Sequence, residues 1–104
     1  MGVEFAASLN AISDDFMPRL RQAFLSDGRW TVHAPRVDNP SAIAFRWGSG
    51  PPRTFWPEDV EVWTQPGRLG VTLYNADNQQ QDAVLQFLAA FARANGYDLS
   101  FDEV

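Results

Sequence analysis

Three carboxylates, at Glu58, Asp59 and Glu61, make up the densest acidic cluster of the chain. Paired carboxylates carry out acid–base chemistry where their surroundings separate their pKa values. In an extended strand Asp59 and Glu61 share one face, because side chains alternate between the two faces. Nothing in the neighbouring sequence marks a substrate cleft, and the spacing lacks the dense oxygen ligands of a calcium loop. We therefore expect this cluster to provide surface charge rather than catalysis.

Nucleophilic and metal chemistry have few residues to draw on. His33 is the only histidine and cysteine is absent, so the multi-histidine and thiolate sites of zinc proteins cannot be built. A serine–His33–carboxylate triad is the one catalytic grouping left, but no nucleophile elbow precedes a helix. The run Gly48-Ser49-Gly50 lacks the lysine of a phosphate loop, and the prolines that follow favour a stiff connection. The sequence thus predicts no catalytic residue, no metal and no cofactor.

Aromatic side chains give the stronger functional signal. All four tryptophans lie between Trp30 and Trp63. Alternation places Trp30 and Trp47 on the core face of a sheet, whereas Trp63 and Tyr74 fall on the opposite face. Their expected neighbours on that face are Arg46, Arg68 and Glu61. Tryptophan, tyrosine and arginine are enriched at binding hot spots, so we expect a binding surface there, unless residues 51–57 fold over these rings.

Charge narrows the choice of partner. The net charge is −5, and residues 76–104 carry five carboxylates against a single arginine. Nucleic-acid binding needs a clustered basic patch, which is missing. No apolar run approaches the ~20 residues of a membrane span, and no signal peptide begins the sequence. These features favour a protein partner with a basic surface, no nucleic acid or membrane, and a cytoplasmic location.

Periodicity predicts helices in the first quarter of the chain. Apolar residues recur three or four apart from Phe5 to Phe24, which is the spacing of a helical stripe. Pro18 interrupts the stripe, and proline is tolerated in a first turn. We therefore expect a helix over 3–12 and a second over 14–26, ended by Gly28. A single kinked helix is the alternative.

Alternation then predicts strands. Segments 29–34 and 42–47 alternate, and 54–57 is a candidate edge segment. Residues 59–75 form a hairpin around a Pro66-Gly67 turn. The simple register pairs hydrophobic residues on the core face and sets Trp63 against Gly70, where an indole covers backbone that glycine leaves bare. A slip of one residue would reverse these faces.

A third helix and a last strand complete the pattern. Asp77 and Gln80 have capping-box spacing, an apolar stripe follows from Val84 to Phe91, and residues 97–102 alternate. A length of 104 residues suits one domain, 1–104. The predicted fold is a two-layer α+β domain. It has a mostly antiparallel sheet of four to five short strands, with N-terminal and C-terminal helices on one face.

In size, charge and predicted architecture, the chain resembles the small acidic α+β proteins with which bacteria bind another protein, such as toxin-neutralising immunity proteins and secretion chaperones. The likeness implies a non-catalytic protein-binding module. Its expected contact residues are Trp63, Tyr74, Glu58, Asp59, Glu61 and Arg46, with the acidic C-terminal segment as an alternative. One other interpretation is a small-molecule binder or minor enzyme with a pocket lined by Trp30, Trp47 and Trp56. Another is a structural subunit that forms a homodimer through its open sheet face.

Overall fold

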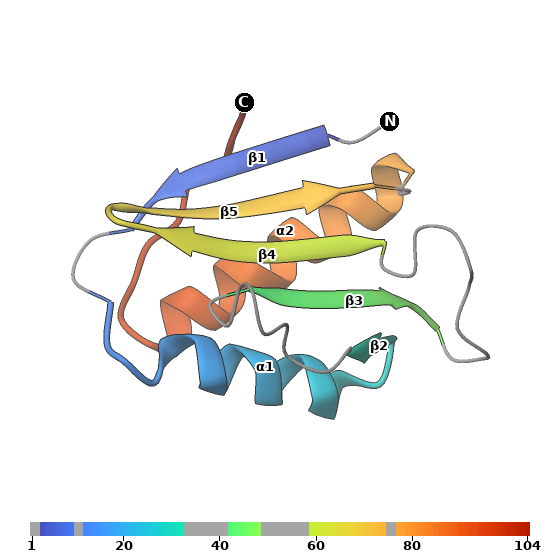
Figure 1. Ribbon diagram of the computed structural model, residues 1–104, viewed down its shortest axis with the longest axis horizontal. Helices are drawn as coiled ribbons and strands as arrows, with labels where there is room; N and C mark the ends of the chain where they lie inside the picture. The colour runs from blue at the N-terminus through green and yellow to red at the C-terminus, as the bar shows by residue number, and fades with distance from the viewer. Residues whose placement is uncertain (1–2, 10–11, 33–41, 49–58, 75–76) are drawn as a thin grey trace.

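The computed structural model describes the chain except for residues 1–2, 10–11, 33–41, 49–58 and 75–76. Its elements in chain order are β1 (Val3–Ser8), α1 (Phe16–Asp27), β2 (Trp30–Val32), β3 (Ile43–Trp47), β4 (Val60–Gln65), β5 (Arg68–Leu73), α2 (Asn78–Ala94) and β6 (Asp102–Glu103) (Figure 1). The strands form a six-stranded sheet in the order β2-β3-β4-β5-β1-β6, and each neighbouring pair is antiparallel. The predicted α+β class is confirmed.

The hairpin of β4 and β5 forms as its sequence predicts. Val60 pairs with Leu73, and Trp63 pairs with Gly70. Gly67 has a φ of 80°, the left-handed conformation that the second central position of a type II turn requires. The alternating hydrophobic residues of both strands are at most 2 % exposed on the core face: Val60, Val62, Leu69, Val71 and Leu73. The register is therefore fixed by burial of one face.

The N-terminal segment is a strand, so the predicted helix over 3–12 is wrong, and so is the single kinked helix. β1 pairs along β5 from Val3 opposite Leu73 to Ser8 opposite Arg68. Helix propensity is a weak preference that tertiary pairing overrides. In this chain one edge of β5 pairs with β4 in the hairpin, and β1 forms hydrogen bonds with the backbone groups of the other edge. The same pairing places Ala7 in the core, where it is 3 % exposed. Within the described part of the chain, the sheet consequently has six strands rather than the predicted four to five.

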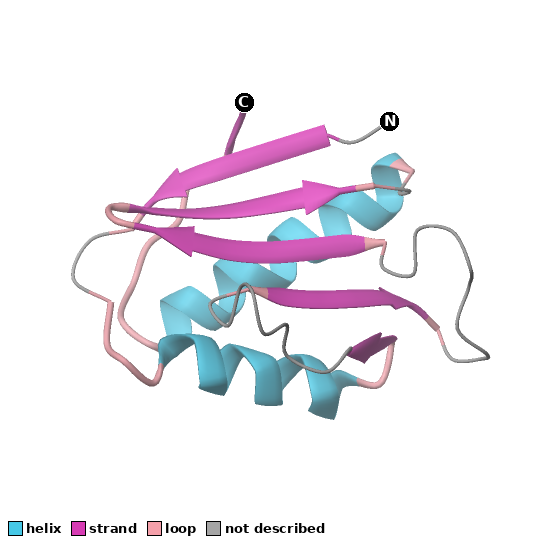
Figure 2. Cartoon of the chain, in the orientation of Figure 1, coloured by secondary structure: helices cyan, strands magenta, loops and turns pink. Residues whose placement is uncertain are grey.

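The two helices contribute to the same core as one face of the sheet. Phe16, Leu20 and Phe24 of α1 and Val84, Leu88 and Ala92 of α2 join the buried residues of the strands in one cluster. The Phe24 ring is central, with its centroid 4.5 Å from those of both Phe45 and Phe87. Figure 2 shows α2 crossing behind the strands in this view. Trp30 is 5 % exposed and Trp47 packs against the cluster, as alternation predicts.

Local signals set the helix ends. Pro18 is the third residue of α1, inside the first turn where its missing N–H costs no helical hydrogen bond. Gly28 ends α1 in the left-handed conformation at φ 84°. Asp77 and Gln80 form the predicted capping box of α2, each side chain accepting a hydrogen bond from the other's backbone N–H. Among the described residues, neither helix is long and apolar enough to cross a membrane.

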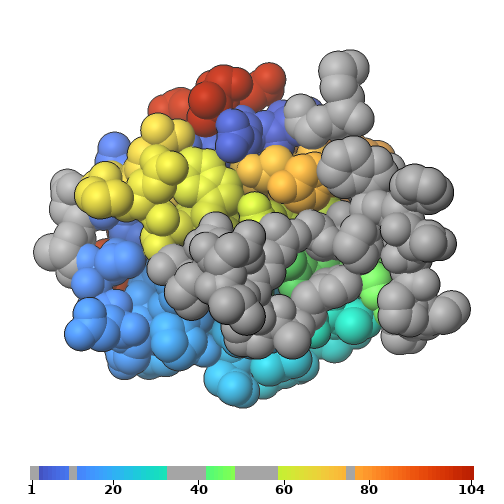
Figure 3. Space-filling view, in the orientation of Figure 1, coloured from blue at the N-terminus to red at the C-terminus, as the bar shows by residue number. Residues whose placement is uncertain are grey.

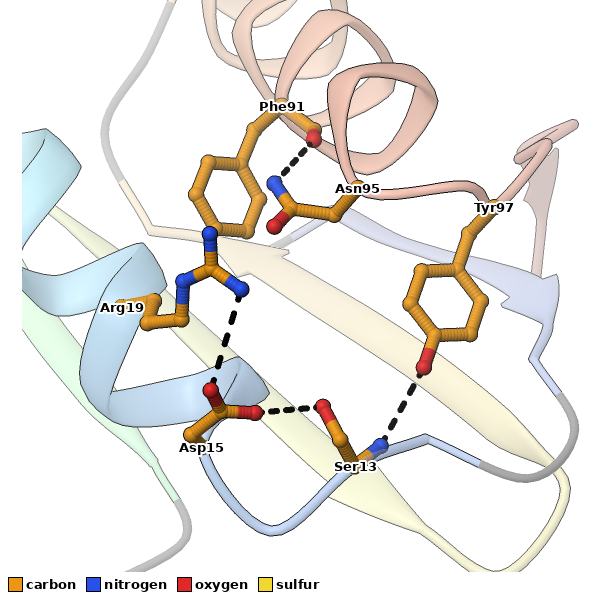
Figure 4. Close-up of polar contacts among 6 residues, drawn as sticks. All are labelled: Ser13, Asp15, Arg19, Phe91, Asn95 and Tyr97. Carbon is orange, nitrogen blue, oxygen red and sulfur yellow. Dashed lines mark hydrogen bonds and ion pairs between the residues drawn. The ribbon is translucent and has the colours of Figure 1, made fainter.

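A small set of contacts joins the start of α1 to the end of α2 (Figure 4). The Ser13 N–H donates to Tyr97 Oη over 3.2 Å, and the Phe16 ring meets the rings of Phe91 and Tyr97 edge-on, with centroids 5.4 Å apart in both cases. Asn95 Nδ2 donates to the Phe91 carbonyl oxygen over 2.8 Å. These contacts direct the chain after α2 back towards β1.

The last strand is shorter than the predicted 97–102. β6 covers Asp102–Glu103 and pairs with Phe5 and Ala6 of β1. The Val104 N–H extends this pairing by donating to the Glu4 carbonyl oxygen over 2.8 Å. β6 therefore forms one edge of the sheet, and its acidic side chains lie beside β1.

Candidate partner-binding surface

Side chains that point away from the helices make up what we call the helix-free face. Strand alternation and register assign to this face Glu4, Ala6, Arg46, Glu61, Trp63, Arg68, Gly70 and Thr72. Figure 1 views the sheet with α2 behind it, and Figure 3 shows side chains of β4 and β5, in yellow-green to yellow, at the surface of the same side.

Trp63 is the largest side chain on this face and is half-buried. Its indole covers Gly70 so closely that a Cβ atom on Gly70 would overlap the Cζ2, Cε2 and Cη2 atoms of the ring. The indole Nε1 donates to Thr72 Oγ1 over 3.1 Å. The predicted pairing of Trp63 with a bare glycine is thus confirmed, and the ring is held against the sheet.

Two further side chains fix the surroundings of the ring. The Thr72 hydroxyl donates to Glu4 Oε1 over 3.3 Å, which continues the hydrogen-bond chain from the indole to a carboxylate. The Arg68 Cζ atom lies 5.3 Å from the ring centroid of Trp63, within the range of a cation–π contact. Trp63 is therefore positioned by β1 and β5 together, without any partner present.

The other predicted contact residues differ in how accessible they are. Glu61 lies opposite Thr72 and is half-buried, as is Tyr74. Arg46 is 8 % exposed and Asp59 is 2 % exposed, so in the free chain a partner reaches little of either side chain. Glu58 lies outside the described residues.

Asp59 has a structural task where β4 begins. Its Oδ2 accepts a hydrogen bond from the Trp47 N–H over 2.8 Å. Its own N–H donates to the Phe45 carbonyl oxygen, and its carbonyl oxygen accepts from the Tyr74 N–H, both over 2.8 Å. The residue therefore links the ends of β3, β4 and β5, and these bonds satisfy a buried polar group.

A depression of about 590 Å³ lies beside the Trp63 site, between the β4–β5 turn, β1 and the segment that leads into β6. We call it the acidic groove. It is lined by Ala6, Ala7, Ser8, Gly67, Arg68, Asp98, Ser100, Asp102, Glu103 and Val104. The three carboxylates are exposed and outnumber Arg68. Because Arg68 borders both Trp63 and the groove, the aromatic ring and the acidic lining belong to one surface.

The sequence predicts part of this surface. Spacing and charge single out Trp63, Arg68 and the acidic C-terminal segment. Thr72 could have been added, since the predicted register already set it opposite Glu61. Glu4 could not, because its segment had the periodicity of a helix.

A second hollow lies on the helical side. Adjoining depressions of about 410 and 400 Å³ between α1 and α2 share Ala23, Ser26 and Phe91. Arg19 and Asp27 are the charged residues of this lining, and each forms an ion pair within the chain, with Asp15 and Arg29 respectively. This hollow consequently has no excess charge with which to select a charged partner.

The tryptophans on the core face are closely surrounded by other rings. The Trp30 centroid lies 5.3 to 5.5 Å from those of Phe24, Phe45, Trp47 and Phe87. Neither Trp30 nor Trp47 lines the acidic groove or the hollow between the helices. Trp56, the third residue of the proposed small-molecule pocket, is not among the described residues. In the described part of the chain, no histidine, aspartate and glutamate side chains group as metal ligands.

No protein family, no curated protein and no solved structure gave a significant match to this chain. The function proposed for it therefore rests on its own residues and their arrangement.

Proposed function

We propose that this chain is a non-catalytic, acidic protein-binding module whose partner presents a basic surface. The observation that carries the proposal is the fixed position of Trp63 on the helix-free face, over Gly70 and bonded to Thr72. A large aromatic side chain that is already ordered loses little conformational freedom on binding, which makes it an effective anchor.

The negative charge of the chain supports a partner with a positively charged surface. The chain has a net charge of −5, and Asp98, Asp102 and Glu103 are exposed in the groove next to the anchor. Opposite charge on the partner would accelerate the encounter and fix the orientation of the complex, and added salt would slow the association. The hollow between the helices lacks such a charge excess and so supports this partner less well.

Within this class, a bacterial toxin-neutralising immunity protein or a secretion chaperone suits the size and acidity of the chain. Both kinds of protein act by covering a surface of another protein and need no catalytic group. The absence of cysteine suits a reducing compartment, and we propose that the chain acts in the cytoplasm.

The test is affinity capture from the source cell with matched surface variants. Immobilised wild-type chain should retain a stoichiometric partner. Trp63→Ala and Glu103→Arg should each reduce the retained amount at least tenfold, as expected for an anchor and a reversed charge. Leu25→Ala is the control, since Leu25 is 49 % exposed on α1, away from this face.

Folding of each variant is checked by thermal unfolding, and Trp63→Phe replaces Trp63→Ala if the alanine variant is unstable. Loss of the partner with Leu25→Ala but not with the Trp63 variants would refute the proposed surface. Retention of no stoichiometric protein by the wild-type chain would refute the function.

A further inference from the structure

We infer that the acidic groove receives an extended, basic segment of the partner, which pairs as an added strand with the edge of β1 at Ser8. This inference rests on the proposed function and specifies how the backbone and the charge of the partner are recognised. The occupant is a strand of a different protein, and a second copy of this chain is the alternative that the experiment tests.

The first step concerns the backbone of β1, which lies next to the edge strand β6 (Figure 1). The Val104 N–H donates to the Glu4 carbonyl oxygen, and Ala6 lies opposite Asp102. In an antiparallel pair the hydrogen-bonded positions recur at every second residue, so Ser8 is the next position of β1 whose N–H and C=O are directed to this side. The described pairing with β6 ends at Ala6. Among the described residues, the outward backbone groups of Ser8 therefore have no strand opposite them.

The second step is that this position opens into the acidic groove. The register of β1 and β6, if it continued, would set Ser100 opposite Ser8. Both serines instead line the groove of about 590 Å³, and both are exposed. The next pair of the ladder is thus replaced by open space. An unpaired strand edge is where an extended peptide adds to a sheet, because its backbone donors and acceptors already have the spacing of a strand.

The third step concerns the charge that the added segment must carry. Asp98, Asp102 and Glu103 are exposed in the lining of the groove. Asp102 and Glu103 are neighbours in β6 and point to opposite faces of the sheet. Basic side chains on either face of an added strand would therefore meet a carboxylate, and an acidic segment would be repelled on both.

The same carboxylates select against a second copy of the chain. Two copies that paired edge to edge would bring their acidic residues together, and like charges opposite one another destabilise a sheet pairing. The net charge of −5 adds to this repulsion. A basic strand reverses the sign of the interaction, so charge complementarity favours a strand of another protein.

The experiment uses short blocked peptides in which lysine and threonine alternate. The first peptide is unmethylated, the second is N-methylated at its threonine residues, and the third is N-methylated at every residue. Because the N–H groups of a strand alternate between its two edges, the second peptide keeps one complete hydrogen-bonding edge and the third keeps none. All three peptides have the same charge, so attraction by charge alone would bind them equally.

We expect the second peptide to bind as tightly as the first, and the third to bind at least about fivefold more weakly, since it cannot donate to the Ser8 carbonyl oxygen. Hydrogen exchange of the Ser8 amide should slow on addition of the first peptide. The Ala7 amide should change less, because it already faces β5. Glu103→Gln should weaken the first peptide about two- to fivefold. The matched control is Asp82→Asn, an exposed carboxylate on α2, which should leave its affinity unchanged.

Equal affinity for the three peptides, or no slowing of exchange at the Ser8 amide, would overturn the inference. Sedimentation of the chain alone should show a monomer, and a dimer that the first peptide dissociates would assign the edge to a second copy instead. The proposed function has its own criterion, which is whether Trp63→Ala removes the captured protein. A chain that loses its partner with Trp63→Ala but does not distinguish the peptides would keep the function and lose the added strand.

Discussion

At Gly70, the lack of a single methyl group allows Trp63 to lie against the sheet. Gly70→Ala would place a Cβ atom inside the indole ring, so the ring must swing out and give up its bond to Thr72. We expect a loss of about 1 to 3 kcal/mol in the free energy of unfolding, as for overpacking elsewhere in proteins. Denaturant unfolding measures this loss, and the Trp63 indole resonance should move to a solvent-exposed position.

A double-mutant cycle isolates the cause of that loss. In a Trp63→Ala background the ring is gone, so Gly70→Ala should change stability by less than about 0.5 kcal/mol, and the difference between the two backgrounds is the coupling between the residues. An equal loss in both backgrounds would mean that the backbone of β5, and not the indole, requires glycine.

The ion pair of Asp27 and Arg29 holds a cation beside the edge of the core. Asp27 Oδ1 accepts a hydrogen bond from Arg29 Nε over 2.6 Å, and this bond holds the pKa of Asp27 below its ordinary 3.8 and raises the pKa of Arg29. The Arg29 Cζ atom lies 4.5 Å from the ring centroid of Trp30. The pair therefore keeps a cation over an aromatic ring at the edge of the core.

Asp27→Asn should lower the free energy of unfolding by about 0.5 kcal/mol at pH 7, a typical value for a solvent-accessible pair. Because the folded pKa of Asp27 is depressed, its contribution is present above pH ~4 and is lost as the pH falls through the folded pKa. The difference between wild type and variant, measured by denaturant unfolding from pH 7 to pH 3, should thus close below about pH 4. A difference that does not shrink as the pH falls below about 4 would show that the ionised carboxylate is not its source.

At the scale of elements, β1 depends on β5 for its structure. The Leu9 N–H donates to the Gly67 carbonyl oxygen, and the Val104 N–H donates to that of Glu4. Given the antiparallel register, the backbone N–H and C=O groups of the odd-numbered residues of β1 form hydrogen bonds with β5. The backbone groups of the even-numbered residues are directed towards β6. β6 ends its pairing at Ala6, so the outward backbone groups of Ser8 have no ladder partner among the described residues.

Proline substitutions along β1 test this alternation. Ala7→Pro removes an N–H that bonds to β5 and should cost on the order of 2 to 3 kcal/mol, because it leaves a buried carbonyl oxygen of β5 unsatisfied. Ser8→Pro removes an N–H that points into the acidic groove and should cost about 1 kcal/mol or less. Thermal unfolding of the two variants measures the contrast, and a larger loss for Ser8→Pro would contradict the assigned register.

The same strand shows how far sequence could predict the fold and the surface. The hairpin register and the Trp63–Gly70 pair followed from alternation and from one turn, since all the interacting residues are close in sequence. β1 pairs with residues sixty to seventy positions away, and its apolar spacing over Phe5 and Leu9 suits a helix equally well. Long-range pairing leaves no local signature, so Glu4 and the acidic groove emerged only in three dimensions.

At the scale of the whole molecule, the acidic groove concentrates negative charge on a chain that is already at −5. Like charges held together repel one another in the folded state and separate on unfolding. Glu103→Gln should therefore raise the free energy of unfolding by about 0.5 kcal/mol or less at low salt. Because the Debye length falls to about 3 Å at 1 M salt, the gain should disappear there.

The same variant should slow association with a basic partner, since long-range attraction is reduced along with the repulsion. Stability gained where binding is lost is the pattern expected of a functional surface. Denaturant unfolding at 10 mM and 1 M sodium chloride, together with association rates for the captured partner, measures both effects. If Glu103→Gln instead destabilised the fold equally at both salt concentrations, Glu103 would stabilise β6 through a local contact. The negative charge of the groove would then not lower the stability of the fold, and no trade-off between stability and binding would exist at Glu103.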